Sequence, residues 1–329
     1  MDKRQYPEVN TMSAFLCLCV IAIHLTATPI SQLTPGSIPH TGLFLINRAL
    51  SFSVPGFLFL SGFKLYSHYG MGTMDVKAFY CKRLRGVLLP YFVAVLVYFA
   101  YYYAKGWVSV SKLPEYLLLG TLVSHFYYIV IAAQFYLLFP VLKWALNRLP
   151  VLTVGISAVC TLAFYTLFRF PRCDRFVGTY LIYFVLGMLF QKYRLGERCL
   201  QHRKILFSCF LLMAAPHLAA LYLRTCRGLQ YSLANAVSVL YCCAAVCVVY
   251  TLCALVCQKW PTVLKLAQPL SRVSFSVYLY HMMLIVLLQY DLFPRFALTP
   301  KEQFLISCLV VYGLVFAWTT VSGQRKKMP

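Results

Sequence analysis

Acidic residues are scarce in this chain, which has 8 Asp and Glu against 30 Lys and Arg in 329 residues. Charged residues of both signs make up only 12% of the sequence, whereas soluble domains carry about 25%. Hydrophobic residues account for 61%, and the mean hydropathy is +0.73. Apolar stretches of roughly 20 residues, the length of a membrane-spanning helix, recur about ten times. These stretches are too long and too continuously apolar for barrel strands, so the sequence predicts an all-α, polytopic integral membrane bundle.

Several other sequence signals are missing. No paired C-x-x-C spacing is present, so a zinc or other metal site is not expected. Most of the 14 Cys lie inside apolar stretches, where a thiol packs as a small apolar group. The first apolar run has no fitting small-residue cleavage site, so we expect it to be a permanent span. No second globular domain or long linker stands out, which predicts one transmembrane domain over residues 1–329.

The net charge of +22 is the next feature to explain. In a soluble protein it would suggest nucleic acid, but here the basic residues lie mainly in short loops between apolar stretches, so no nucleic-acid partner is expected. Orientation by the positive-inside rule and attraction to anionic membrane lipid explain most of this charge. Binding of a polyanionic cofactor is the second explanation.

The apolar pattern predicts about ten spans, with a short interfacial helix near residues 113–123. The predicted spans are approximately 11–29, 43–66, 87–104, 126–146, 150–168, 176–191, 205–223, 232–257, 273–290 and 304–321. Pro55, Gly56 and Gly62 in the second span predict a kink or a close helix contact.

Loop charge predicts the orientation. With both termini in the cytoplasm, most Lys and Arg residues fall on the inner side, including Lys3, Arg4 and the terminal Arg325, Lys326 and Lys327. An eleventh span near Leu113 would reverse the second half of the chain.

His24 is the only ionisable side chain in the first span. It lies 13 residues in, which at about 1.5 Å per residue is roughly 20 Å deep in a hydrocarbon core of roughly 30 Å. An ionisable residue at such depth is a candidate functional residue, here a general base or a proton relay. A histidine that only hydrogen-bonds a neighbouring helix is the alternative.

Three further stretches contain candidate residues. Lys82, Arg83 and Arg85 precede the third span, where they suit phosphate or serve as a membrane anchor. His281 lies in the ninth span within SVYLYHMMLI, and its alternative role is packing. His125 and Gln134 belong to HFYYIVIAAQFYLLFP, which an aromatic belt and helix–helix contacts also explain.

These stretches, in this order, resemble the membrane-bound acyltransferase 3 family of bacteria. That family shows an early span ending in an apolar run and His, then V-P-x-F-F-x-x-S-G-F, R-x-x-R-x-x-x-P-Y, W-F-L…Y-L-x-x-P and Y-x-x-x-Y-L-x-H. The corresponding segments here are VIAIH ending at His24, Val54 to Phe63, Arg83 to Tyr91, Phe126 to Pro140 and Ser274 to His281. Each motif alone is weak, but the ordered set covers nearly the whole chain.

The resemblance implies acyl transfer in the bacterial cytoplasmic membrane. A cytoplasmic acyl-CoA, commonly acetyl-CoA, would modify a hydroxyl of an outward-facing glycan or a lipid-linked sugar, without a metal. It further implies that His24 takes the hydroxyl proton or forms an acyl-imidazole, and that His281 or a tyrosine stabilises the oxyanion. The residues that it assigns to substrate or acyl-CoA binding are Ser61, Lys82, Arg83, Arg85, Tyr91, His125, Gln134 and Tyr136.

Two departures from the family pattern leave other functions open. The family usually has Arg eleven residues before the first-span His, where this chain has Ser13, and Gly86 stands at the second Arg of R-x-x-R. The alternatives are a polysaccharide or lipid-linked precursor transporter and a catalytically degenerate assembly subunit. The acceptor, the acyl group and the oligomeric state stay open. Cys173 and Cys226 fall in predicted outer loops, where two free thiols are favoured over a disulfide.

Overall fold

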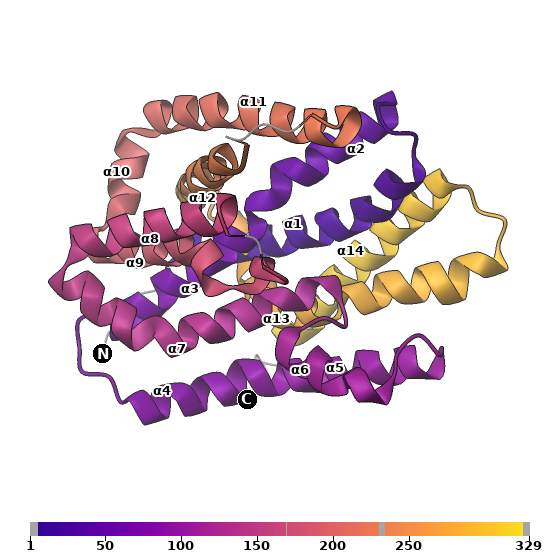
Figure 1. Ribbon diagram of the computed structural model, residues 1–329, viewed down its shortest axis with the longest axis horizontal. Helices are drawn as coiled ribbons and strands as arrows, with labels where there is room; N and C mark the ends of the chain where they lie inside the picture. Colours follow the sequence, from indigo (N-terminus) through magenta and orange to yellow (C-terminus); the bar gives the residue numbers. More distant parts are fainter. Residues whose placement is uncertain (1–5, 169, 230–233, 325–329) are drawn as a thin grey trace. The chain divides into compact units, whose positions relative to one another are not determined.

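Figure 1 shows the computed structural model, which describes residues 6–168, 170–229 and 234–324. Every regular element within these residues is a helix, so the prediction of an all-helical polytopic membrane bundle is confirmed. Lys3, Arg4, Arg325, Lys326 and Lys327, which the charge pattern assigns to the inner side, lie outside the described residues.

Eight of the described helical segments are long and apolar enough to cross a membrane. They are Pro7–Gln32, Ile38–Tyr69, Val76–Ala104, Ser124–Arg148, Arg203–Arg227, Ala234–Lys259, Thr262–Arg295 and Pro300–Ser322.

The predicted fifth and sixth spans correspond to shorter helices. They are α8 (Pro150–Thr166), with 17 residues, and α9 (Leu181–Tyr193), with 13. At about 1.5 Å per residue, α9 is roughly 20 Å long, less than the roughly 30 Å of hydrocarbon. Residues 177–180, expected at the start of the sixth span, form a 3₁₀ turn instead, and a second 3₁₀ turn, Cys173–Arg175, precedes them. The short helix expected near residues 113–123 is α6 (Leu113–Leu119), which ends at Gly120 in the left-handed conformation that favours glycine.

The chain divides into two compact units, and the expectation of one domain over residues 1–329 stays a prediction. The first unit contains Met1–Phe57 and Gly196–Pro329, and the second contains Leu58–Leu195.

Helix α1 (Pro7–Gln32) is the central element of the first unit. It packs against α2 (Ile38–Ala49), α12 (Ala234–Lys259), α13 (Thr262–Leu287) and α14 (Pro300–Gln324). Helix α11 (Arg203–Arg227) lies against α12 and α2, as Figure 1 shows. Small and branched side chains fill the interface of α1 with α13 and α14: Ala14, Cys17, Ile21, Leu25, Leu270, Val277, Ile285 and Val311. This core fixes the position of His24, which α1 carries between Ile21 and Leu25.

The second unit is built around α7 (Tyr127–Arg148), which contacts α4 (Val76–Arg83), α6 and α8. Helix α3 (Ser53–Tyr69) contributes its later residues and meets α9 at two glycines. A Cβ atom added at Gly62 would overlap the Phe184 carbonyl, and one added at Gly187 would overlap the Phe59 carbonyl. The predicted close helix contact at Gly62 is therefore confirmed, because only hydrogen atoms fit between the two backbones.

A π-helical turn, Leu84–Leu88, interrupts the third span between α4 and α5 (Leu89–Ala104). The side chain of Asp75 caps α4 by accepting a hydrogen bond from the Ala78 amide. π-Helical turns inside α-helices are frequent at functional sites. Here the turn contains Arg85 and Gly86, two positions that the motif comparison singled out.

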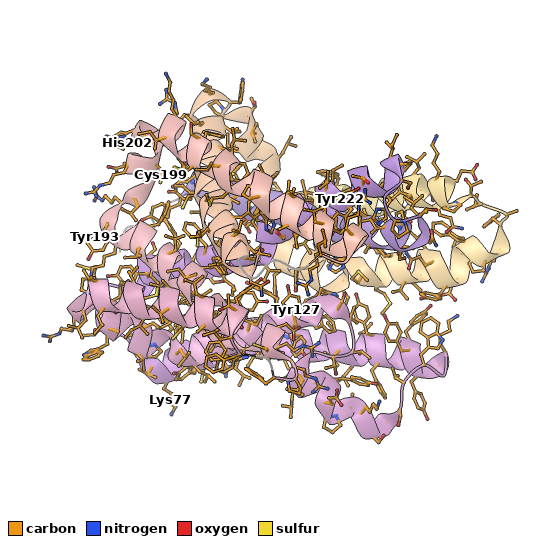
Figure 2. All side chains as sticks on the ribbon, turned by 45° about the horizontal axis from the view of Figure 1, so that its top comes forward. Lys77, Tyr127, Tyr193, Cys199, His202 and Tyr222 are labelled. Atoms are coloured by element: carbon orange, nitrogen blue, oxygen red, sulfur yellow. The ribbon has the colours of Figure 1, made fainter. Side chains whose placement is uncertain are left out.

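All 14 cysteines are free, including Cys173 and Cys226, as the sequence favoured. Figure 2 shows Cys199 on α10 (Leu195–Gln201), close to His202 at the start of α11. Burial raises the pKa of the Cys199 thiol, against a smaller opposite effect of its hydrogen bond with Thr251. A raised pKa disfavours the thiolate, which is the nucleophilic form of a cysteine.

Candidate functional site

His24 of α1 and His281 of α13 form a pair inside the first unit. Their ring centroids lie 5.1 Å apart at an interplanar angle of 47°. His281 is 1% exposed, and His24 is partly exposed. Two histidines from helices at opposite ends of the chain thus meet within a membrane-spanning bundle, where ionisable side chains are costly and usually functional.

Backbone carbonyls hold the His281 ring in one orientation. Nδ1 lies 2.9 Å from the Tyr278 carbonyl oxygen and 3.1 Å from that of Val277. Carbonyl oxygens only accept hydrogen bonds, so Nδ1 is the N–H donor. In the neutral ring Nε2 is then the proton acceptor, because a neutral imidazole carries one N–H. Catalytic and metal-binding histidines are commonly oriented in this way. His281 therefore fits a proton-accepting role better than the oxyanion-stabilising role considered from the sequence.

Aromatic side chains form the wall beside the histidine pair. The Tyr278 ring lies 6.0 Å from that of His281, and Phe57 meets Tyr278 edge-on at 6.4 Å. Phe57 belongs to the VPGFLFLSGF stretch that the motif comparison selected. This residue of the motif therefore packs against the tyrosine beside the histidine pair.

Asn47 of α2 fixes the turn of α1 that carries His24. Its side-chain amide donates to the Ile23 carbonyl and to the Thr26 hydroxyl, each at 2.8 Å. The Thr26 hydroxyl in turn donates to the Ala22 carbonyl at 2.7 Å. These hydrogen bonds tie α2 to α1 on either side of His24 in the sequence, which makes Asn47 a positioning residue.

Ser13 stands at the position where the family that the sequence resembles usually has an arginine. It is buried at 3% exposure, and its hydroxyl lies 3.3 Å from that of Ser274 on α13. The Ser274 hydroxyl also donates to the Ser271 carbonyl. A compact neutral hydrogen-bonded pair therefore replaces the cation, and no positive charge is available at this position for a donor phosphate.

The basic segment before the third span divides into two groups. Lys82, Arg85 and Gly86 line an exposed cavity of about 560 Å³ in the second unit, together with Ala78 and Cys81. The Arg83 guanidinium instead lies between aromatic rings, 5.4 Å from the Phe79 centroid and 5.5 Å from that of Tyr136. Lys82 and Arg85 can therefore meet a phosphate, whereas Arg83 makes cation–π contacts.

The remaining residues that were predicted to bind substrate or acyl-CoA make hydrogen bonds or ring contacts within the second unit. The Tyr91 hydroxyl donates to the Tyr116 and Leu117 carbonyls at 3.1 and 3.0 Å, which fixes the end of α6. His125 is buried, with its ring 4.5 Å from that of Phe126. The Ser61 hydroxyl lies 3.5 Å from that of Tyr128. Gln134 donates to the Val130 and Arg175 carbonyls and accepts from the Val177 amide.

The structure thus brings His24 and His281 together, and Arg83 and Tyr136 together. Within the described residues, no group of three or more His, Cys, Asp or Glu side chains gathers as a metal site would require. Sequence reasoning did not select Asn47 or Tyr278 as site residues. A polar residue in a span is the one signal that marks Asn47, whereas Tyr278 stands at the second Tyr of the Y-x-x-x-Y-L-x-H motif, which could have marked it.

Comparison with known protein families gives one match. The model of a family described as an acyltransferase domain covers residues 6–322, nearly the whole chain and both compact units. No curated protein and no solved structure matches the chain.

Proposed function

The chain belongs to this acyltransferase family, the acyltransferase 3 family, and from that premise we propose that it moves an acyl group from a cytoplasmic acyl-CoA to a hydroxyl of an extracytoplasmic or lipid-linked glycan. That it is a multi-pass membrane acyltransferase follows from the family and from the eight spanning helices. The acyl donor, with acetyl-CoA as the simplest case, the glycan acceptor and the bacterial cytoplasmic membrane are the proposed parts. The observation that supports a reaction centre is the contact between His24 and His281.

We propose that the two rings act as one proton-accepting unit. The acceptor hydroxyl oxygen attacks the thioester carbonyl carbon, and its proton passes to the imidazole pair. The carbon–sulfur bond then breaks, and the leaving thiolate takes up that proton as CoA–SH. His24, the more exposed ring, meets the hydroxyl, while His281, whose Nδ1–H is held by two carbonyls, keeps the pair in orientation.

The donor phosphates are assigned to Lys82 and Arg85. Both side chains line the same cavity beside the π-helical turn, and Arg offers a bidentate fork for phosphate. Lys82→Ala and Arg85→Ala are each expected to raise the KM for acyl-CoA about tenfold, since a lost charge-assisted hydrogen bond costs about 1.5–3 kcal/mol. Lys77→Ala, on the same helix but outside the cavity, is the matched control and should leave that KM unchanged. An unchanged KM in both cavity variants would contradict this assignment.

The experiment that tests the proposed function is the transfer of radiolabel from acyl-CoA to a glycan fraction in membranes. Label that enters the glycan only with the wild-type protein supports the enzyme. Glycan that accumulates outside the membrane without any dependence on acyl-CoA would support the transporter alternative instead. Retention on a CoA matrix, competed by free CoA, would argue against a degenerate assembly subunit.

A further inference from the structure

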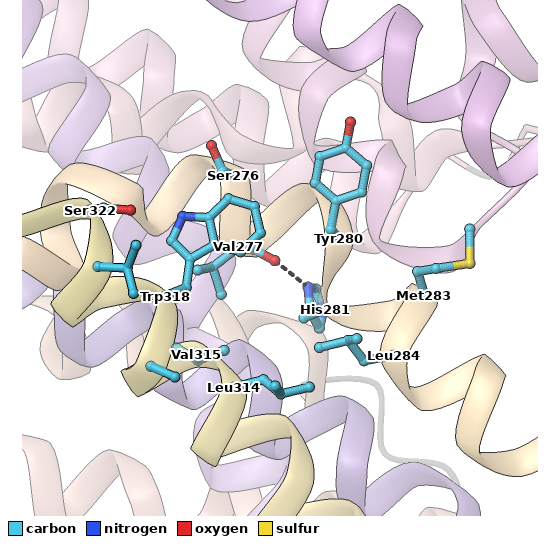
Figure 3. Close-up of a pocket in the computed structure, with 12 residues that line it drawn as sticks. Ser276, Val277, Tyr280, His281, Met283, Leu284, Leu314, Val315, Trp318 and Ser322 are labelled. Atoms are coloured by element: carbon cyan, nitrogen blue, oxygen red, sulfur yellow. Dashed lines mark hydrogen bonds between the residues drawn. The ribbon is translucent and has the colours of Figure 1, made fainter. Parts of the chain in front are cut away.

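A groove runs between α13 and α14 in the first unit, and Figure 3 shows the side chains that line it. Its volume is about 860 Å³, within the roughly 300–1,000 Å³ of small-molecule sites. In Figure 3, Trp318 of α14 lies beside Val277 of α13, and Leu314 lies on the side of Leu284. The groove extends along α13 from Ser276 to Leu284, which is about 12 Å at 1.5 Å per residue.

The chemistry of the groove selects a hydrocarbon chain. Its walls are mainly apolar, and three of the α14 side chains are about half exposed: Leu314 at 47%, Trp318 at 52% and Val321 at 54%. Both helices are long and apolar enough to cross a membrane, so an apolar groove between them matches hydrocarbon rather than water. Polar groups in the lining are limited to the side chains of Ser276, Tyr280, His281, Trp318 and Ser322, so a sugar or a nucleotide would leave most of its hydrogen-bonding groups without partners here.

The groove is continuous with the candidate reaction centre, because His281 is one of its lining residues. A ligand in it therefore has one part against the imidazole and the rest along α14. Two hydrocarbon chains satisfy this arrangement: the acyl chain of the donor and the lipid anchor of a lipid-linked acceptor.

The absence of basic side chains from the groove lining favours the acyl chain of the donor over the lipid anchor of an acceptor. In a lipid-linked sugar, one or more phosphates separate the lipid from the sugar hydroxyls, and phosphates in proteins are met by Arg or Lys. None of the groove-lining residues, all of which the structure describes, is Lys or Arg. In an acyl donor, by contrast, the hydrocarbon begins at the reacting carbonyl itself, so no charged group needs to pass through the groove.

We propose that the α13–α14 groove binds the hydrocarbon chain of the transferred acyl group, and that the preferred donor is an acyl-CoA longer than acetyl-CoA. This inference rests on the proposed acyl transfer and specifies its donor. The reactive carbonyl lies at His281, and the chain runs past Leu314 and Trp318. Acetyl-CoA, whose methyl group leaves the groove empty, is then a poor donor.

The test is a series of acyl-CoA donors from acetyl to octanoyl, assayed in membranes. For the wild type, kcat/KM is expected to rise about fourfold for each methylene that the groove buries. Leu314→Trp, which fills the groove, should lower the ratio of octanoyl to acetyl transfer by about tenfold or more. Leu309→Trp is the matched control, because Leu309 is 75% exposed on the same helix and does not line the groove. A wild type that prefers acetyl-CoA, or two variants with the same donor profile, would overturn the proposal.

A binding measurement separates failure of the groove from failure of the proposed function. Octanoyl-CoA with a diazirine at the chain end is photolysed with the full-length protein, and the labelled peptides are mapped by mass spectrometry. Label within residues 276–284 or 314–322, competed by octanoyl-CoA but not by excess phospholipid, supports the groove even if no acyl group is transferred. Label elsewhere, or label that only phospholipid displaces, contradicts the groove even if transfer is observed.

Discussion

At the scale of single residues, the contact between His24 and His281 depends on hydrogen bonds from neighbours that sequence reasoning did not select. Asn47 donates to the Ile23 carbonyl and to the Thr26 hydroxyl, and so fixes the turn of α1 that carries His24. The ring of His281 is held by the backbone carbonyls of its own helix. The position of His24 therefore depends on hydrogen bonds from another helix, α2.

Asn47→Leu is expected to lower kcat for acyl transfer by about tenfold or more, because a small displacement of a reacting group has large kinetic effects. The KM for acyl-CoA should change little, since the Asn47 side chain donates its hydrogen bonds to α1 and does not line the cavity of Lys82 and Arg85. Steady-state kinetics in membranes, normalised to the amount of folded protein, gives both quantities.

Thr26→Val is the matched variant, because it removes one of the two acceptors of Asn47 and keeps the side-chain shape. Its effect on kcat should be smaller than that of Asn47→Leu. Equal kcat in Asn47→Leu and the wild type would show that the α2 hydrogen bonds do not position His24.

At the scale of helices, the contact of α3 with α9 depends on glycines. A Cβ atom at Gly62 would meet the Phe184 carbonyl, which is backbone and cannot rotate away as a side chain can. Gly62→Ala is therefore expected to destabilise the protein by about 1–3 kcal/mol, the usual cost of overpacking. Thermal unfolding of the detergent-solubilised protein measures this change.

Gly155→Ala on α8 is the control for this substitution. A Cβ atom at Gly155 meets nothing within 4 Å, and alanine has the higher helix propensity. Its unfolding temperature should equal or exceed that of the wild type. A Gly62→Ala protein as stable as Gly155→Ala would mean that α3 and α9 do not approach through these glycines.

The Gln134 side chain supports the start of the short helix α9. It bonds the Arg175 carbonyl and the Val177 amide, and so holds the 3₁₀ turns that precede α9. Gln134→Leu leaves these partly buried backbone groups without that side-chain partner, at a cost of about 1 kcal/mol each. The yield of folded protein should fall, while the KM for acyl-CoA of the folded fraction stays unchanged. A raised KM with a normal yield would instead support the donor-binding role that the resemblance implied.

At the scale of the whole molecule, loop charge and span number together predict where the chain ends lie. Among the described residues, eight helices are long enough to span, and the sequence predicts ten spans; both numbers are even, so each predicts that the two termini lie on the same side. The positive-inside pattern of the loops predicts that this side is the cytoplasm. A fluorescent protein fused after the C-terminus should therefore fluoresce, and alkaline phosphatase fused there should be inactive. Active phosphatase at the C-terminus would contradict the orientation.

The sequence predicted more of the fold than of the site, for physical reasons. A helix that spans the bilayer needs a run of about 20 apolar residues, which is visible in the sequence itself. Composition alone therefore predicts helices of spanning length, and eight are found among the described residues. The 3₁₀ turns before α9 could not be predicted, because they depend on hydrogen bonds with Gln134 on another helix, which donates to the Arg175 carbonyl and accepts from the Val177 amide. Both histidines could be selected as rare ionisable groups, but their contact joins α1 to α13 and no local pattern encodes it. The groove could not be predicted from the sequence, because it is formed by the packing of α13 against α14.

The most direct test of the histidine pair compares label transfer from radiolabelled acyl-CoA to glycan in the wild type, His24→Ala, His281→Ala and the double variant. His217→Ala is the control, because His217 is also a buried histidine of the first unit but bonds Ser51 and Ser238 instead. Two groups that act as a unit lose activity together, so both single variants and the double variant should fall to the same low rate per folded protein, while His217→Ala keeps its rate. Wild-type transfer rates in His24→Ala would contradict the assignment of this pair as the reaction centre.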